Sequence, residues 1–338
     1  MQASKIERIP AAGSRAKPTV IAIGGAKGGI GKSLIAANLA VYLASQNWRT
    51  VAVDLDLGAA NLHLYLGVWS LQHRINDYLD KKFERLEQIA VETRFGPRLI
   101  GGGSSRLGAA NLPFARKLKL MRAIQTLDAD VVVVDLGGDT AYNVLDFYLQ
   151  ADHGIVMTSC DPASYLDAYT FVKMALHRRL TRLFGPENRQ TADHKDLELL
   201  SLLNQFVGPD AMANGDKGSK ITDLLDAVRE TVPAGLPLVS RAIERFQPHL
   251  LVNMATDTDS AGELVQRFRK VARRMLSIDV PSLDHIPTAT EIARSTRDLI
   301  PEAARNPDGA LVQHLARIVN QLQPDLNPIP LVRSAAGR

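Results

Sequence analysis

Residues 27–33 read Lys-Gly-Gly-Ile-Gly-Lys-Ser and stand between an apolar run at residues 19–23 and a helical pattern that begins at Lys32. Glycine-rich backbone can approach a chain of phosphates closely, and its N–H groups and the start of the helix supply positive potential. In this setting we expect Lys32 to meet the terminal phosphates and the Ser33 hydroxyl to ligate Mg²⁺. The stretch therefore predicts a P-loop, with one departure, because the strict pattern has glycine where this chain has Ala26.

The flanking sequence predicts the fold. Short apolar runs indicate buried strands at 19–23, 50–54, 98–100, 131–135, 154–158, 249–253 and 283–286. Helical patterns separate them, among them 32–45, 115–127 and 308–322. Strands that alternate with helices are typical of a doubly wound, mostly parallel α/β sheet. We therefore expect the Rossmann-like three-layer sandwich of P-loop NTPases.

Residues 185–247 interrupt this alternation. They contain amphipathic stretches at 196–206 and 221–231, joined by turn-rich sequence. We interpret the segment as a helical insertion at the sheet edge. The P-loop domain is then expected to span residues 18–323, between a disordered basic tail at 1–17 and a disordered, proline-containing tail at 324–338.

The composition excludes several classes of protein. With 46% hydrophobic and 22% charged residues, the 338-residue chain can fill a large core and is not disordered as a whole. Its single cysteine, Cys160, excludes a disulfide framework and any all-cysteine metal or iron–sulfur site within one chain. No apolar run reaches the roughly 18 residues of a membrane span, and residues 1–17 lack a signal-peptide core. A soluble, cytoplasmic protein is expected.

Three polar residues stand at the ends of predicted strands, namely Asp54, Asp135 and Asn253. Each taken alone could be an ordinary strand-end residue. In open α/β sheets, however, ligands bind at the carboxyl ends of the strands. The three are therefore candidates for a site beside the P-loop, whose expected phosphate contacts are Gly28, Gly29, Ile30, Gly31, Lys32, Ser33 and Leu34.

The second lysine of the loop, Lys27, makes the motif more specific. Lys-Gly-Gly-x-Gly-Lys-Ser resembles the deviant Walker A motif of the MinD/ParA family, and the likeness covers about residues 19–322 apart from the insertion. The resemblance implies ATP and Mg²⁺ as ligands, slow and partner-stimulated hydrolysis, and an ATP-dependent homodimer. It also implies that Lys27 crosses to the phosphates of the partner subunit.

The resemblance implies a role for each remaining candidate. Residues 53–62 look like switch I, with Asp56 orienting the attacking water and Asp54 helping to hold the water shell of Mg²⁺. Asp135 matches the Walker B aspartate. The implied metal set is Ser33, Asp54 and Asp135, and the implied catalytic set is Lys27, Lys32 and Asp56. Asn253 matches a position that reads adenine in the family, and the alternative is a buried asparagine that bonds backbone groups.

Switch II departs from the family pattern. The family usually has Asp-x-x-x-Gly, whereas this chain has Asp135-Leu136-Gly137-Gly138-Asp139. A carboxylate at 139 would repel a triphosphate unless it faces Mg²⁺, Lys27 or solvent. The amides of Gly137 and Gly138 can still contact phosphate. Nucleotide binding is expected, and the rate of hydrolysis is left open.

Residues 143–158 and 177–180 are most similar to the FlhG/FleN-type branch, which regulates flagellar number and placement. This implies a spatial regulator that works through an unidentified protein partner, with recruitment to a cell pole as one mode. A nucleoid-bound partitioning ATPase is the first alternative. It depends on one basic helical run, for which we favour a solvated face over nucleic-acid binding: Arg267, Arg269, Lys270, Arg273 and Arg274. An ATP-binding scaffold with negligible hydrolysis is the second alternative.

The apolar stripe at 309–322 suits either a bilayer surface or the protein's own sheet. Helices that lie on membranes usually carry several basic residues and large aromatic side chains. This helix has only Arg317 and His314 and neither Trp nor Phe. We therefore expect it to pack on the domain, with membrane contact peripheral at most.

Overall fold

The computed structural model describes residues 17–58, 60–103, 112–184, 194–207 and 220–322. Its centre is one eight-stranded sheet in the order β3-β4-β2-β5-β1-β6-β7-β8, in which the edge strand β3 is antiparallel and the rest are parallel. The strands are β1 Thr19–Gly24, β2 Thr50–Leu55, β3 Val91–Glu92, β4 Arg98–Ile100, β5 Val131–Leu136, β6 His153–Thr158, β7 His249–Ala255 and β8 Ser282–Pro287.

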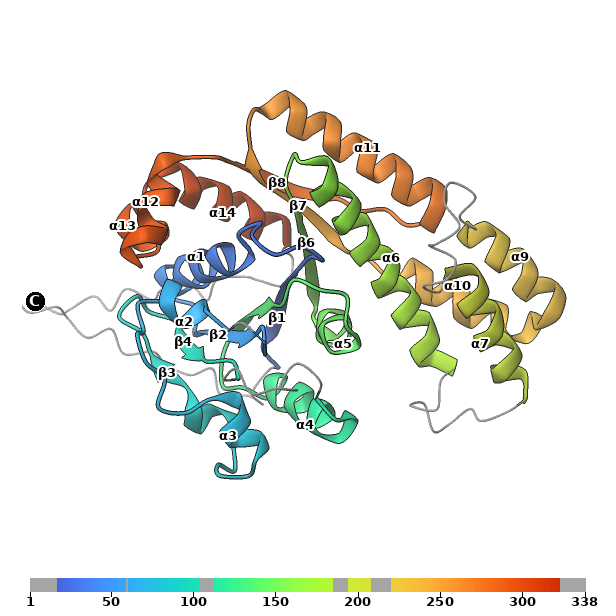
Figure 1. Ribbon diagram of the computed structural model, residues 1–338, viewed down its shortest axis with the longest axis horizontal. Helices are drawn as coiled ribbons and strands as arrows, with labels where there is room; N and C mark the ends of the chain where they lie inside the picture. Colours follow the sequence, from blue (N-terminus) through green and yellow to red (C-terminus); the bar gives the residue numbers. More distant parts are fainter. Residues whose placement is uncertain (1–16, 59, 104–111, 185–193, 208–219, 323–338) are drawn as a thin grey trace, which may run out of the picture.

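Helices cover both faces of the sheet (Figure 1). One layer contains α1, α2, α13 and α14, and the opposite layer contains α4, α5, α6 and α11. The helices are α1 Lys32–Ser45, α2 Leu62–Tyr65, α3 Ile75–Leu79, α4 Phe114–Ile124, α5 Tyr142–Gln150, α6 Pro162–Phe184, α7 His194–Val207, α9 Ile221–Thr231, α10 Leu236–Glu244, α11 Thr258–Leu276, α12 Thr290–Asp298, α13 Glu302–Arg305 and α14 Ala310–Leu322. Among the described residues, none of the helices is long and apolar enough to span a bilayer.

Alternation along the central strands explains the two cores. In β1, Ile21 and Ile23 belong to the core that contains α1 and α14, whereas Val20 and Ala22 belong to the core that contains α5 and α6. The four valines of β5 alternate in the same way. A strand buried on both faces needs apolar side chains at every position, and a crossover helix then connects it to a parallel neighbour. The predicted doubly wound sheet is confirmed.

The three helices α7, α9 and α10 lie beside α6 at one end of the molecule (Figure 1). Their buried side chains, among them Leu203, Leu224 and Val239, belong to the same core as α5 and α6. The stretches predicted as helices at 196–206 and 221–231 correspond to α7 and α9, whereas the helix α10 was missing from the prediction. The supposed start of the insertion at 185 and the loop at 208–219 lie outside the described residues.

The last described helix, α14, packs on the domain. It buries one stripe against β8 and α1: Leu311, Leu315, Ile318, Val319 and Leu322. The packing predicted from the apolar stripe is thereby confirmed. Apart from Lys17, the two predicted tails lie outside the described residues.

Candidate nucleotide-binding site

The loop at residues 25–31 joins the carboxyl end of β1 to the amino end of α1. Gly29 and Gly31 have φ angles of 80° and 86°, in the left-handed region that glycine adopts without strain. Gly31 is the N-cap of α1 and has no side chain with which to bond the first N–H groups of the helix. A Cβ at Gly28 or Gly29 would meet no atom within 4 Å. The loop therefore presents open backbone and a helix N-terminus, which suits a phosphate.

Lys32 lies inside this loop and is 7% exposed. Its Nζ donates a hydrogen bond to the carbonyl oxygen of Lys27 at 2.7 Å. Burial lowers the pKa of Lys32, and the nearby carboxylates of Asp135, Asp56 and Asp139 oppose that shift. The ammonium group is thus held at the mouth of the loop, where a phosphate chain could replace the carbonyl as its acceptor.

Asp54 and Asp135 are direct neighbours in the register of β2 and β5. Both are buried, and the Asp54 carboxylate accepts hydrogen bonds from the backbone N–H groups of Asp56 at 3.1 Å and Leu62 at 3.0 Å. Burial raises the pKa of Asp54 to about 7. For Asp135, burial first and the Asp54 carboxylate second raise the pKa well above its ordinary value. Two ionised carboxylates that are buried side by side are unfavourable unless a positive charge lies close to them, so the pair favours the binding of a cation.

The Asp135 carboxylate fits a divalent cation. Neither of its oxygens has a hydrogen-bond partner among the described residues. The Ser33 side chain lowers the pKa of Asp135, as the charge of Lys32 does. No group of three His, Cys, Asp or Glu residues in the described chain could hold a metal by itself. This donor set suits Mg²⁺, which usually takes one or two protein ligands together with phosphate and water oxygens.

The two predicted switch segments meet at the loop. A Cβ at Gly137 would lie 3.5 Å from Oδ1 of Asp56. A Cβ at Gly138 would lie 3.0 Å from the backbone nitrogen of Gly28 and 3.0 Å from Nζ of Lys32. Residue 138 is therefore glycine because its backbone passes close against the P-loop. The predicted catalytic and phosphate-contacting residues are thus brought together at one edge of the sheet.

Asp139 lies at the surface and its Oδ1 accepts a hydrogen bond from the backbone N–H of Ala141 at 2.8 Å. This bond closes a turn that leads into α5. The carboxylate still lies near enough to raise the pKa of Lys32. The sequence left open whether Asp139 faces Mg²⁺, Lys27 or solvent, and in this structure it faces solvent.

Lys27 has a different environment from Lys32, since 39% of its side chain is exposed. Its Nζ lies 2.9 Å from Oδ2 of Asp161, the residue before α6. The same carboxylate oxygen accepts a hydrogen bond from the backbone N–H of Ser164 at 3.2 Å. The bond to Asp161 raises the pKa of Lys27 and the bond to Lys27 lowers that of Asp161. Asp161 was not among the predicted site residues. The sequence Asp-Pro-Ala-Ser at residues 161–164 indicates the start of a helix, but it does not indicate a contact with Lys27.

Asn253 contacts the loop rather than open space. It is 5% exposed, and its Nδ2 donates a hydrogen bond to the carbonyl oxygen of Ile30 at 2.8 Å. A Cβ at Gly31 would lie 2.5 Å from the same Nδ2. The sequence placed Asn253 at the end of its strand, whereas β7 continues to Ala255 with a shift of register between Val252 and Ala255. Of its two predicted roles, bonding to backbone is the one seen here.

Comparisons with known proteins agree with this geometry. The family described as the CobQ/CobB/MinD/ParA nucleotide binding domain matches residues 21–301. The antiactivator FleN of Pseudomonas aeruginosa is 29% identical over 164 residues, which are 48% of this chain and 58% of FleN. The flagellum site-determining protein YlxH of Helicobacter pylori is 31% identical over 165 residues, which are 46% of this chain and 52% of YlxH. The matches thus span just over half the length of these relatives.

Solved structures share the fold. The septum site-determining protein MinD of Pyrococcus horikoshii, complexed with Mg-ADP, aligns with a TM-score of 0.57 at 17% identity over 91% of this chain and 96% of that one. The family match covers the P-loop, both switch segments and all of the parallel strands from β2 to β8. The chain therefore belongs to the CobQ/CobB/MinD/ParA nucleotide-binding family.

Proposed function

We propose that this protein binds Mg-ATP in its P-loop and acts as an ATP-dependent dimerisation switch that regulates the position or number of a cellular structure. The observation that carries the proposal is the contrast between the two lysines of one loop. Lys32 is buried inside the loop, whereas Lys27 is half-exposed and held by one surface carboxylate. A lysine in that position is accessible to a second molecule.

The chain's own residues divide the work as follows. The Lys32 ammonium exchanges the Lys27 carbonyl for phosphate oxygens. Ser33 and Asp135 would hold Mg²⁺, with Asp54 beside Asp135, and a bound Mg²⁺ would supply positive charge against the phosphates. Asp56 orients the attacking water beside Gly137. Lys27 leaves Asp161 and reaches across to the phosphates of a second copy of the chain.

The cellular role is inferred from the relatives. FleN is named as an antiactivator and YlxH as a flagellum site-determining protein. We propose that this chain likewise serves a flagellum or other polar machinery, in the cytoplasm, through a protein partner that stimulates slow hydrolysis. A fluorescent fusion in the source cells tests this, because foci at a pole or at the flagellar base are expected, and signal spread over the nucleoid would contradict it.

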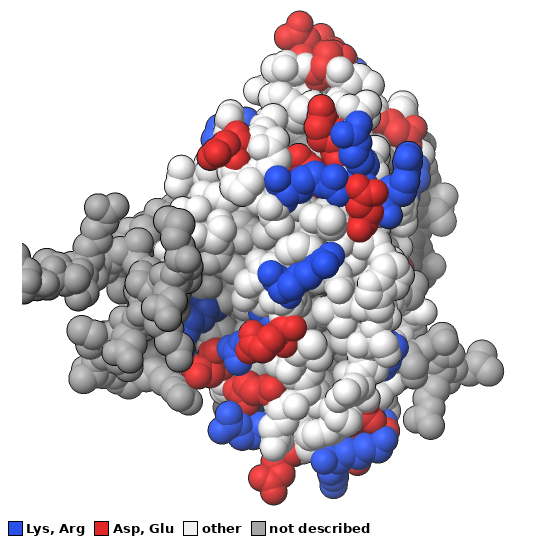
Figure 2. Space-filling model, turned by 90° about the vertical axis from the view of Figure 1, so that its left-hand side faces the viewer, with Lys and Arg blue, Asp and Glu red and all other residues white. Residues whose placement is uncertain are grey.

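A partitioning role on the nucleoid is less well supported. In the basic run on α11, Arg269 and Arg273 both bond Asp279, which neutralises part of that face. On the face seen in Figure 2, Lys and Arg are interspersed with Asp and Glu rather than gathered into a basic field. DNA binding with ATP, and its dependence on salt, separates the two roles, since a partitioning protein loses affinity steeply as salt rises.

Measured phosphate release separates an enzyme from a scaffold. Asp139 is exposed and its carboxylate bonds its own turn, which supports a site that can still accept a γ-phosphate. We therefore expect slow but measurable release that depends on Mg²⁺. Release no faster than that of an Asp56→Ala variant would favour the scaffold.

A further inference from the structure

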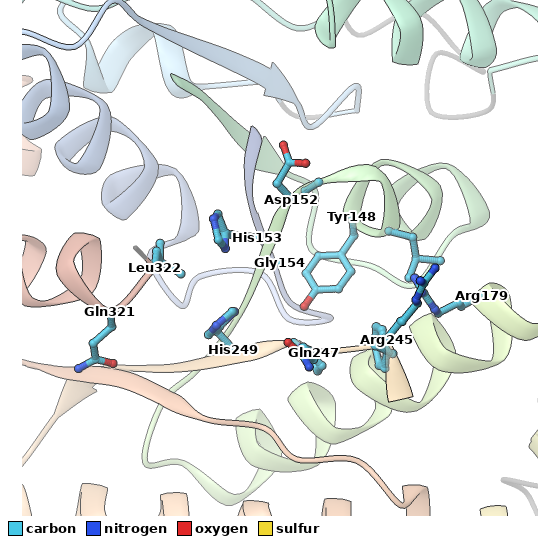
Figure 3. Close-up of a pocket in the computed structure, with 14 residues that line it drawn as sticks. Tyr148, Asp152, His153, Gly154, Arg179, Arg245, Gln247, His249, Gln321 and Leu322 are labelled. Atoms are coloured by element: carbon cyan, nitrogen blue, oxygen red, sulfur yellow. The ribbon is translucent and has the colours of Figure 1, made fainter. Parts of the chain in front are cut away.

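A second pocket lies at the opposite edge of the sheet from the P-loop. His153 begins β6 and His249 begins β7, so the pocket opens at the amino ends of strands whose carboxyl ends face the nucleotide site. Its volume is about 390 Å³, which is within the range of small-molecule sites. Figure 3 shows Arg179, Arg245, Gln247 and His249 around this space, below the ring of Tyr148 in that view.

Two guanidinium groups form one wall. Nε of Arg179, on α6, donates a hydrogen bond to the carbonyl oxygen of Ala242 at 2.8 Å, which fixes the plane of that guanidinium. Arg245 follows α10, and its side chain has no ion pair or hydrogen bond within the described part of the chain. Burial first, and the charge of Arg245 second, lower the pKa of Arg179. The two cations are thus close enough to repel each other without an anion between them.

The other lining groups add hydrogen-bond donors and little negative charge. Among the described residues, Asp152 is the single acidic one that lines the pocket. Its carboxylate accepts a hydrogen bond from the backbone N–H of Val20 at 2.8 Å and lies 3.8 Å from Nζ of Lys17. The Tyr148 side chain is 3% exposed, and its hydroxyl has no hydrogen-bond partner among the described residues. The pocket is therefore rich in donors and poor in free acceptors.

We propose that this pocket is a second ligand site that binds a small organic anion through an oxyanion group, a phosphate or a carboxylate. Arg179 and Arg245 form the binding pair, because planar guanidinium groups bind both kinds of oxyanion with paired hydrogen bonds. His249 and Gln247 lie on the side of the pocket where the rest of the ligand would sit. The site is separate from the P-loop and can be filled while nucleotide is bound.

Calorimetric titration of the full chain tests the site. The protein is first saturated with Mg-ADP so that the P-loop cannot take the probe, and the titration is repeated without nucleotide in a Lys32→Ala variant. Inorganic phosphate and succinate are titrated separately, in a low-salt buffer that contains neither group, to distinguish a phosphate from a carboxylate ligand. We expect one saturable site per chain for at least one probe in both backgrounds.

Two arginine variants make the test specific. Arg245→Gln removes one exposed cation of the pair and should weaken binding about tenfold or more, because a charge-assisted hydrogen bond is lost. Arg274→Gln removes an exposed arginine on α11, outside the pocket, and should leave the affinity unchanged. The proposal is wrong if neither probe binds, if Arg245→Gln binds as tightly as the wild type, or if both variants weaken binding equally.

Discussion

Nζ of Lys27 lies 2.9 Å from Oδ2 of Asp161, although 134 positions separate the two residues in the sequence. In this single chain, the lysine that we expect to serve a second subunit is thus held by its own subunit. Both side chains are about half exposed, so the contact is weak enough to exchange. Dimerisation must break it, which makes Asp161 a restraint on the proposed switch.

Asp161→Asn should therefore favour the dimer. Asparagine still caps α6, because its side-chain oxygen can accept the Ser164 N–H, but it offers no charge to Lys27. We expect the variant to dimerise with ATP at a protein concentration up to about fivefold lower than the wild type needs, because a surface ion pair contributes about 1 kcal/mol at most. Analytical ultracentrifugation over a concentration series measures this. Weaker dimerisation in a variant of unchanged melting temperature would show instead that Asp161 assists the dimer.

Lys32→Ala should abolish ATP binding. It removes the one buried cation that the loop holds ready for the phosphates, whereas Lys27→Ala removes an exposed cation and serves as the matched control. Titration with a fluorescent ATP analogue in the presence of Mg²⁺ measures both. Unchanged affinity in Lys32→Ala would refute the P-loop assignment.

Asn253→Ala tests whether the asparagine holds the loop or reads the base. Loss of its bond to Ile30 leaves a carbonyl without a partner and should cost about 1–3 kcal/mol of stability. If Asn253 only positions the loop, the affinities for ATP and GTP should fall by the same factor. A selective loss of ATP affinity, with GTP affinity unchanged, would instead establish a contact with adenine.

Without nucleotide and Mg²⁺, stability should fall as the pH rises from about 4 to 7. Burial raises the pKa of Asp54 to about 7 from an ordinary value of 3.8, so in this window the unfolded chain has released a proton that the folded chain retains. The slope approaches about 1.4 kcal/mol per pH unit for one such group, or about 3 kcal/mol at most between pH 5 and 7.

Urea unfolding at pH 5 and 7 measures that difference, and an Asp54→Asn variant is the control. The variant cannot ionise at this position, so its stability should change less over the same interval, and the difference between the two proteins reports Asp54 together with its effect on the pKa of Asp135. Equal pH dependence in both would contradict the raised pKa.

Local patterns in the sequence were enough to predict most of the fold. The valines of β5 and the isoleucines of β1 follow the two-faced pattern of buried parallel strands, and α9 was predicted to the residue. The helix α10 was missed because Pro237 stands near its start and a short 3₁₀ turn at Pro233–Gly235 precedes it. Two prolines in five residues indicate a loop when only the sequence is considered.

The residues of the candidate site also fall into two groups, those that a local pattern predicts and those whose contacts depend on the tertiary arrangement. Lys32, Ser33, Asp54 and Asp135 follow from a motif and from strand ends, and the structure gathers them at one edge of the sheet. The bond from Asn253 to Ile30 and the ion pair from Lys27 to Asp161 join segments that lie far apart in the sequence. Which backbone carbonyl an asparagine bonds, or which carboxylate a lysine meets, depends on how loops at the ends of different strands are placed. No local periodicity encodes that placement.

The mass of an Asp56→Ala variant in solution, with and without Mg-ATP, tests the switch most directly. The variant lacks the carboxylate that we propose orients the attacking water, and it keeps the P-loop unchanged, so it should bind ATP and accumulate as a dimer. Light scattering behind a sizing column should give twice the mass of one chain with Mg-ATP, and one chain mass without nucleotide. The Lys27→Ala Asp56→Ala double variant should stay at one chain mass. An Asp56→Ala protein that binds ATP and remains a monomer would contradict the account.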